Sequence, residues 1–364
     1  MIAAVFAALL LCPAASANRS DPPELSAECA ILMDAESGRV LFEKNPDAQR
    51  PIASITKLVT ALVAAELITS PQEPMTIRPE WTGAEGSSIY LRAGETVTPE
   101  ILLYGLLLSS GNDAAVALAG YCAGDVDAFV ERMNARAQEL GMAHTRFMNP
   151  NGLSEEGHCS TARDMALAAR ACLRNETVAK IAATRSITLG ARTFTNHNKL
   201  LWRYPGCIGM KTGYTEASGR TLVSAAQRDG QTLIAVTLNA PDDWADHTAL
   251  LDYGFEHFSW QMLCQAGTQA ARVPVRESLV PSVALLAAET VSYPLAPGER
   301  VETRVCVREA PAAPVAAGEV LGRLEFCMNG QRVGECTLVS AANVRRDAAE
   351  PRSALRRILD RLFP

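Results

Sequence analysis

Lysine is scarce in this chain of 364 residues: lysine and arginine together number 34, and five of these are lysine. The five are Lys44, Lys57, Lys180, Lys199 and Lys211. Histidine is equally rare, with 5 residues, and the formal net charge is -6. A negative chain without a long basic run before its last residues argues against nucleic acid as a partner. The scarcity also makes any lysine that falls inside a motif more informative.

Metal-binding patterns are missing as well. No histidine stands at metal-ligand spacing from another, and the ten cysteines form neither a C-x-x-C nor a zinc pattern. The sequence therefore predicts no metal and no cofactor. Cys12 would leave with an N-terminal signal, so nine cysteines remain, and an odd number cannot all pair within one chain. We expect most of them to be buried apolar residues, and a disulfide within the group Cys306, Cys327 and Cys336 stays open.

The only long apolar run, residues 2–11, is shorter than the roughly 20 residues that a spanning helix needs. It is followed at residues 15–17 by Ala-Ser-Ala, a small-x-small cleavage pattern. An apolar run followed by a small-x-small cleavage pattern is typical of a secretory signal peptide, which here would be residues 1–17. We therefore expect an extracytoplasmic protein, at the outer face of the cytoplasmic membrane.

The remaining chain divides into two predicted domains and a tail. In residues 18–267, a hairpin signal comes first, helical patterns fill the middle and strand patterns return late, among them at residues 185–195. This order predicts an α/β (α+β) domain, in which helices flank an antiparallel sheet, rather than alternating βαβ units. Residues 268–345 alternate between apolar and polar around turns such as Asn329-Gly330, which predicts a small all-β, sandwich-like domain. Residues 346–364 form the tail.

Three short motifs carry the chemistry. Ser54 and Lys57 form S-x-x-K, Ser110 and Asn112 form S-x-N, and Lys211 opens K-T-G. This ordered trio is the signature of penicillin-binding proteins and serine β-lactamases. Ser54 is the only serine in the chain with a lysine three residues later, and this spacing puts both side chains on one face of a helix.

The motif residues suit acyl transfer to a serine. A serine hydroxyl is a weak nucleophile until a base removes its proton. Lys57 can act as that base only when it is neutral, and burial and a neighbouring cation such as Lys211 both favour the neutral amine. Gly213 would allow the backbone of an edge strand to lie against an extended peptide.

The resemblance extends beyond the motifs. The chain resembles the D-alanyl-D-alanine carboxypeptidases, the low-molecular-mass penicillin-binding proteins, over about residues 27–258. The segments that carry this resemblance are residues 51–58, 108–115, 147–153, 160–165, 209–215 and 246–255. A weaker similarity to the family's C-terminal β domain continues through residues 316–322.

The resemblance implies a role for each motif residue. Ser54 would be the acylated nucleophile and Lys57 the base, while Ser110 would relay a proton to the leaving amine. Asn112 would hold the substrate amide and Lys57. Lys211, Thr212 and Gly213 would bind the substrate. The backbone amides of Ser54 and Tyr214 would form the oxyanion hole.

The resemblance implies a penicillin-binding serine carboxypeptidase that removes the terminal D-alanine from peptidoglycan stem pentapeptides and so limits cell-wall cross-linking. Its partners would be these stem peptides, with β-lactam antibiotics as inhibitors. A DD-endopeptidase, a transpeptidase and a β-lactamase share the trio and stay open as alternatives. A silent wall-binding protein is disfavoured, because every motif residue is intact.

The tail has the pattern of a basic amphipathic helix. Leu355, Ile358, Leu359 and Leu362 fall on one helical stripe, and four arginines lie among them in residues 351–364. Such a helix is typical of peripheral contact with anionic lipid. A helix packed on its own domain is the alternative.

Overall fold

The structure is a computed structural model that describes residues 22–307 and 310–347. Contacts within the chain divide it into two units, which meet in the sequence between Phe258 and Ser259. The predicted signal peptide and the predicted amphipathic tail at 351–364 lie outside the described residues. No helix in the described part of the chain is long and apolar enough to cross a membrane.

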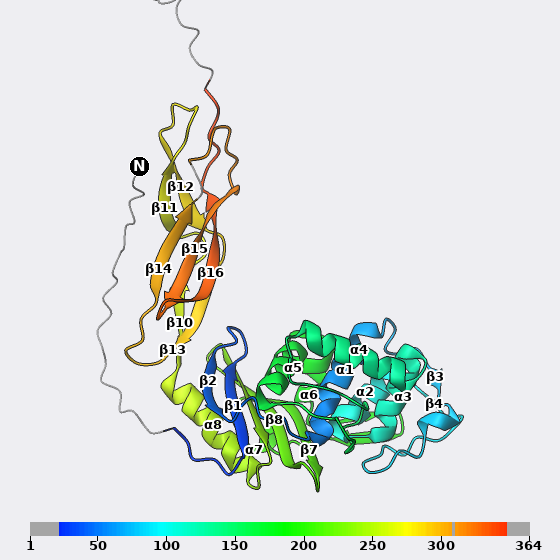
Figure 1. The fold of residues 1–364 in the computed structure, drawn as a ribbon. Helices are drawn as coiled ribbons and strands as arrows, with labels where there is room; N and C mark the ends of the chain where they lie inside the picture. Colours follow the sequence, from blue (N-terminus) through cyan, green and yellow to red (C-terminus); the bar gives the residue numbers. More distant parts are fainter. Residues whose placement is uncertain (1–21, 308–309, 348–364) are drawn as a thin grey trace, which may run out of the picture. The chain divides into compact units, whose positions relative to one another are not determined.

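The first unit is built on a five-stranded antiparallel sheet (Figure 1). Its strand order is β2-β1-β9-β8-β7, so the first strands pair with the last ones of the unit. The strands are β1 (Cys29–Asp34), β2 (Val40–Lys44), β7 (Cys207–Thr215), β8 (Gly219–Arg228) and β9 (Gln231–Leu238). Every residue of β1 is buried, because helices cover both faces of the sheet. The predicted α+β class is confirmed.

Helix α8 (Asp243–His257) packs against β8 and β9 on one face of the sheet, and the helices grouped around α1 lie on the opposite face (Figure 1). On that opposite face, α1 (Lys57–Leu67) is the central helix and contacts the five helices around it. These are α2 (Pro99–Leu108), α3 (Asn112–Ala123), α4 (Val126–Glu139), α5 (Ala162–Arg174) and α6 (Glu176–Ala183). The first eight residues of α1 are buried, as expected for a helix with apolar residues all round.

Side-chain caps set the starts of several helices. Thr161 caps α5 by accepting from the Asp164 amide at 3.0 Å, and the helix ends at Arg174. The short 3-10 turn η1 (Ala53–Thr56) leads directly into α1, so Ser54 lies just before that helix. The strand character predicted around 185–195 is present, as a hairpin of β5 (Ser186–Leu189) and β6 (Arg192–Thr195). Gly190 makes this turn possible with a φ of 59°.

Smaller elements complete the first unit. Strands β3 (Met75–Thr76) and β4 (Thr96–Val97) pair at the two ends of a long excursion that includes the 3-10 turn η2 (Pro79–Trp81). The short helix α7 (Leu200–Arg203) precedes β7. The long excursion matters for the site, because its residues 85–95 lie against the start of α3.

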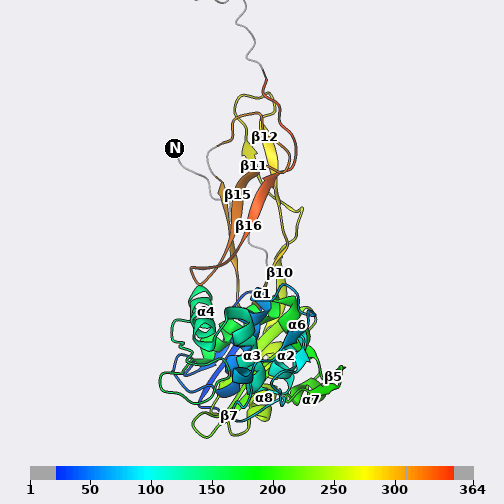
Figure 2. The same ribbon diagram turned by 90° about the vertical axis from the view of Figure 1, so that its right-hand side faces the viewer.

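The second unit is all-β in the residues described, as predicted. Its larger sheet has the order β11-β12-β16-β15-β14, and β10 pairs with β13 in a separate two-stranded sheet. The strands are β10 (Ser259–Cys264), β11 (Gln269–Pro274), β12 (Ser282–Ala287), β13 (Val291–Leu295), β14 (Glu302–Val307), β15 (Val320–Met328) and β16 (Gln331–Ser340). Figure 2 shows β15 and β16 side by side, joined by the predicted Asn329-Gly330 turn. Because β10 pairs within this unit, we propose that the β domain begins at residue 259 rather than at 268.

Candidate active site

Three separate segments of the chain supply the motif residues. Ser54 lies in the turn η1, and Lys57 is the first residue of α1. Ser110 lies in the turn between α2 and α3 with a φ of 59°, and Asn112 begins α3. Lys211 belongs to β7, the last strand of the sheet order. The fold thus brings residues separated by more than 150 positions of sequence to one edge of the sheet.

Lys57 is the buried centre of this arrangement, with a fully buried side chain. Its Nζ donates to Oγ of Ser54 at 2.9 Å, to Oδ1 of Asn112 at 2.6 Å and to the carbonyl oxygen of Asn151 at 2.6 Å. An ammonium group has three N–H donors, and all three are used here. A neutral amine keeps two N–H groups for Asn112 and Asn151, which turns its lone pair toward the Ser54 hydroxyl.

The surroundings of Lys57 favour that neutral amine. Burial is the main cause that lowers its pKa well below 10.5, and the charge of Lys211 lowers it further, while Asp113 acts in the opposite direction. Lys211 is itself buried, which lowers its pKa to about 7. Two buried cations destabilise each other, so the loss of one proton relieves both. Lys57 bonds to the Ser54 hydroxyl, so the loss of its proton is the one that yields a base beside the nucleophile.

Sequence reasoning missed the part played by Asn151, whose contact with Lys57 is made by a backbone carbonyl rather than by a side chain. The neighbouring Gly152 has a φ of 84°, and a Cβ there would lie 2.0 Å from the carbonyl oxygen of Ala53. Thr60 of α1 also donates to the carbonyl oxygen of Pro150, at 2.6 Å. The 150–152 segment is therefore held tightly against the start of α1. The pair Asn151-Gly152 could have indicated a turn in the sequence. It could not have indicated that this turn contacts Lys57.

A buried histidine stabilises the same turn. Nε2 of His158 lies 2.9 Å from Oγ1 of Thr56, and the amide of Met148 donates to Nδ1 at 3.2 Å. Because Nδ1 accepts, the ring is neutral and its Nε2–H donates to Thr56. Burial is the first cause that lowers the pKa of His158 to about 4. His158 therefore acts as a structural residue between the 148–158 loop and the S-x-x-K turn.

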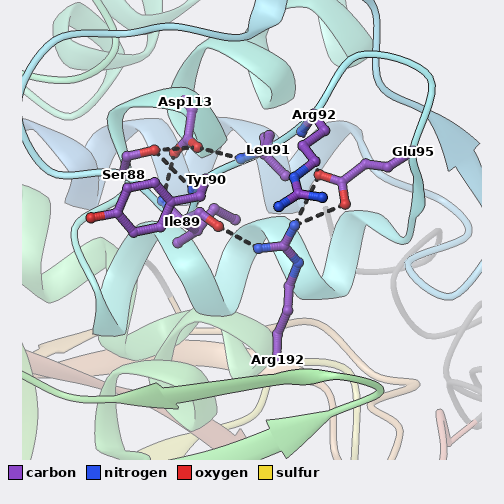
Figure 3. A network of polar contacts seen from close by, with 8 residues as sticks. All are labelled: Ser88, Ile89, Tyr90, Leu91, Arg92, Glu95, Asp113 and Arg192. Carbon is purple, nitrogen blue, oxygen red and sulfur yellow. Dashed lines mark hydrogen bonds and ion pairs between the residues drawn. The ribbon is translucent and has the colours of Figure 1, made fainter.

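Asn112 and Asp113 fasten the 85–95 loop to α3, and Figure 3 shows the contacts of Asp113. Nδ2 of Asn112 donates to the carbonyl oxygen of Glu85 at 2.5 Å, which directs its Oδ1 toward Lys57. The Asp113 carboxylate accepts from the Ser88 hydroxyl at 2.7 Å, the Ile89 amide at 3.0 Å and the Leu91 amide at 2.9 Å. The loop is thus tied to the first two residues of α3, Asn112 and Asp113.

Arg192 holds the same loop from the other side (Figure 3). It comes from the hairpin strand β6, and its guanidinium donates to both carboxylate oxygens of Glu95, at 2.9 and 2.8 Å. It also donates to the carbonyl oxygen of Ile89. Nη2 makes both contacts with Glu95 and Nη1 makes the contact with Ile89, so Arg192 fixes the 85–95 loop against the hairpin at two points.

An open cavity of about 370 Å³ lies over the motif residues. Its lining residues are Ser54, Ser87, Ser110, His197, Lys199, Thr212, Gly213, Tyr214, Arg220, Asp243 and Trp244. Ser54 is half-buried and opens on this space, whereas Lys57 lies beneath it. The sequence had identified Ser54, Ser110 and the residues from Thr212 to Tyr214, but not the other wall.

Arg220 is the main charged residue of that other wall. It stands opposite Tyr214 in the pairing of β8 with β7. Its guanidinium lies 2.9 Å from Oδ1 of the buried Asp243 and 5.7 Å from the centre of the Trp244 ring. No pattern along the chain links Arg220 to the motifs, because only the β7–β8 hairpin brings it beside Thr212. Arg220 and Lys199 both line the cavity, which makes it suited to an anionic group.

Comparison with known proteins is consistent with this geometry. A family model described as D-alanyl-D-alanine carboxypeptidase matches residues 16–242. A model described as the C-terminal domain of penicillin-binding protein 5 matches residues 258–346. Each of the two units thus has its own match.

Relatives match over most of the chain. D-alanyl-D-alanine carboxypeptidase DacF of Bacillus subtilis is 32% identical, over 88% of this chain and 86% of its own length. D-alanyl-D-alanine carboxypeptidase DacC of Escherichia coli is also 32% identical, over 89% of this chain and 86% of its own length. The solved structure of penicillin binding protein 5 from Haemophilus influenzae superposes with a TM-score of 0.77 at 30% identity, covering 90% of this chain and 100% of that one.

Proposed function

The chain belongs to the D-alanyl-D-alanine carboxypeptidase family, and from this premise we propose that Ser54 is the residue its substrate acylates. The activity is that of a serine-type carboxypeptidase, a hydrolase that acts on cell-wall peptidoglycan and binds penicillin. One observation supports the assignment of Ser54 above all others. Its hydroxyl opens on the cavity and lies 2.9 Å from the amine of a fully buried lysine.

In the proposed reaction, the neutral Lys57 takes the Ser54 proton as Oγ attacks the carbonyl carbon of the penultimate D-alanine. The peptide bond breaks, and the terminal D-alanine leaves as an amine that receives its proton through Ser110. Water then hydrolyses the ester on Ser54. A positioned base of this kind contributes about 10²–10⁴-fold to the rate.

The other motif residues would bind and polarise the substrate. Lys211 and Thr212 hold the terminal carboxylate of the stem peptide, and Asn112 holds its amide. The backbone amides of Ser54 and Tyr214 stabilise the oxyanion, which is the interaction expected to strengthen in the transition state. Penicillin would acylate Ser54 in the same way, because its strained amide takes the place of the peptide.

Labelling with penicillin tests the assignment directly. The wild-type protein should gain one penicilloyl group, and mass spectrometry should place it on the peptide that contains Ser54. Ser54→Ala should abolish labelling without lowering the Tm, whereas Ser87→Ala, a change at another serine of the same cavity, should keep it. Labelling of Ser54→Ala at a different residue would refute the proposal.

Product analysis separates the reactions that share this site. Incubation with a stem pentapeptide should release free D-alanine. Release of cross-linked partners would instead indicate an endopeptidase, and new cross-links a transpeptidase. Rapid steady-state turnover of penicillin, in place of a long-lived acyl-enzyme, would indicate a β-lactamase.

We also propose that the enzyme works outside the cytoplasm and contacts the membrane through residues 351–364. The support is the sequence alone, namely the signal pattern of residues 1–17 and the basic amphipathic pattern of the tail. Both segments lie outside the described residues. Co-sedimentation with anionic liposomes should be stronger for the mature protein than for one that ends at Glu350, and salt should weaken it. Equal sedimentation of the two forms would rule out the anchor.

A further inference from the structure

Two cysteines that are distant in sequence lie beside each other in the β domain. Cys264 ends strand β10, and Cys336 lies within β16. Both thiols donate to the same acceptor, the carbonyl oxygen of Glu289, at 3.6 Å from Cys264 and 3.3 Å from Cys336. Burial, and next to it the charge of the Cys336 thiol, raise the pKa of Cys264, so the two thiols are close enough to interact. The sequence had left open a pair within Cys306, Cys327 and Cys336, and Cys264 was not part of that group.

We propose that Cys264 and Cys336 form an intramolecular disulfide when the enzyme is exposed to a disulfide oxidant. The two residues belong to one apolar cluster, in which Cys336 is fully buried and Cys264 packs at the edge. Cys264 is half-buried and so remains accessible to an oxidant. An enzyme that acts on the cell wall works in a compartment where such bonds persist.

The oxidant would be a small-molecule or protein disulfide, R–S–S–R. The Cys264 thiolate attacks one of its sulfur atoms, so that a mixed disulfide forms and one R–SH is released. The Cys336 thiolate then attacks the Cys264 sulfur, which releases the second R–SH. Two electrons pass from the protein thiols to the oxidant, and their two protons end on the released thiols. Burial raises the pKa of Cys264 to about 11, so the rate should increase with pH.

The bond would join parts of the domain that share no strand pairing. Strand β10 pairs with β13 in the small sheet, whereas β16 lies in the middle of the five-stranded sheet. The loop that the bond closes runs from residue 264 to 336 and includes most of the domain. Closing a long loop restricts the unfolded chain more than closing a short one. The disulfide should therefore stabilise the β domain in particular.

A thiol count on the mature protein tests the proposal. One sample is treated with dithiothreitol and another with oxidised glutathione, and thiols are titrated in denaturant after the reagents are removed. The reduced protein should show the nine cysteines of residues 22–347, and the oxidised protein two fewer. A non-reducing peptide map should contain one linked pair, Cys264 with Cys336.

A matched variant shows whether the pair is specific. Cys306→Ser removes another half-buried cysteine of the same domain and should still lose two thiols on oxidation. Cys264→Ser should lose none. Oxidation should also raise the Tm of the wild-type β domain by about 10 °C, and should leave that of Cys264→Ser unchanged. Penicillin labelling reports that the catalytic domain is folded in every sample.

Three results would overturn the proposal. In the first, the oxidised wild-type protein keeps all its thiols. In the second, the peptide map contains a different cysteine pair. In the third, glutathione stays on Cys264 as a stable mixed disulfide, which would mean that Cys336 cannot reach it.

Discussion

The backbone of Gly213 lies directly against the amide of Ser54. A Cβ on Gly213 would lie 2.9 Å from the Ser54 nitrogen and 2.5 Å from Oγ1 of Thr221. Both contacts are shorter than a Cβ tolerates, and Thr221 is itself held by its hydrogen bond to the carbonyl oxygen of Ile52. The last strand of the sheet and the nucleophile therefore have a fixed separation that only glycine allows.

We expect Gly213→Ala to slow acylation of Ser54 by penicillin about 10- to 100-fold, because displacement of reacting groups by about 1 Å has effects of this size. Stopped-flow acylation measures the rate. The control is Gly334→Ala, a strand glycine where a Cβ would lie 3.6 Å from its nearest neighbour. Equal rates for the two variants and the wild type would show that β7 can move freely.

Lys57→Arg tests the base. Arginine keeps the positive charge but does not release its proton in proteins, so acylation should fall by at least about 10²-fold. Lys44→Arg is the control, because the Lys44 amine donates to the carbonyl oxygen of Leu25 and neither residue lines the cavity. The Tm of each variant shows whether it folds. Near-normal acylation of Lys57→Arg would assign the base to another group.

The two buried lysines predict a bell-shaped pH profile. Acylation should rise with pH as Lys57 loses its proton, and should level off well below pH 10.5 because the pKa of Lys57 is lowered. Lys211 must stay charged to bind a carboxylate, so kcat/KM should fall above about pH 7, the pKa of Lys211. A peptide with a C-terminal amide should lose this descending limb. If kcat/KM falls above about pH 7 for both peptides, Lys211 does not bind the carboxylate.

Arg220→Gln should weaken binding of the stem peptide. A hydrogen bond to a charged group contributes about 1.5–3 kcal/mol, so KM should rise at least about 10-fold while kcat changes little. The effect should be smaller for the C-terminal amide. Arg203→Gln, at an exposed arginine of α7 that does not line the cavity, is the control. An unchanged KM for Arg220→Gln would mean that the cavity wall carries no carboxylate contact.

Arg192→Met should loosen the 85–95 loop by removing its bonds to Glu95 and Ile89. Since Glu85 orients the Asn112 amide, acylation should slow by about 10-fold, and amide hydrogen exchange in the loop should increase. Arg92→Met is a close control, because Glu95 accepts from the Arg92 backbone amide rather than from its side chain. Unchanged exchange in Arg192→Met would show that Asn112 and Asp113 hold the loop without Arg192.

Local patterns were sufficient for the features that depend on residues close in the chain. The three-residue spacing of Ser54 and Lys57 places them together at the start of α1 whatever surrounds them. Thr161 caps α5, and Asn329-Gly330 turns β15 into β16, because these conformations depend on a few neighbouring residues. The 185–195 segment shows the limit, since Gly190 alone does not tell a strand from a hairpin.

Packing between distant segments decided the rest. Burial of Lys57, which sets its pKa, comes from the helices around α1, and its third acceptor is a carbonyl of residue 151 that no side-chain motif encodes. Arg220 reaches the cavity through strand pairing, and Cys264 meets Cys336 through the contact of two sheets. Such contacts join residues tens to hundreds of positions apart, and one sequence carries no local signal for them. Only the folded chain brings these residues together and removes the water that would otherwise keep both lysines charged.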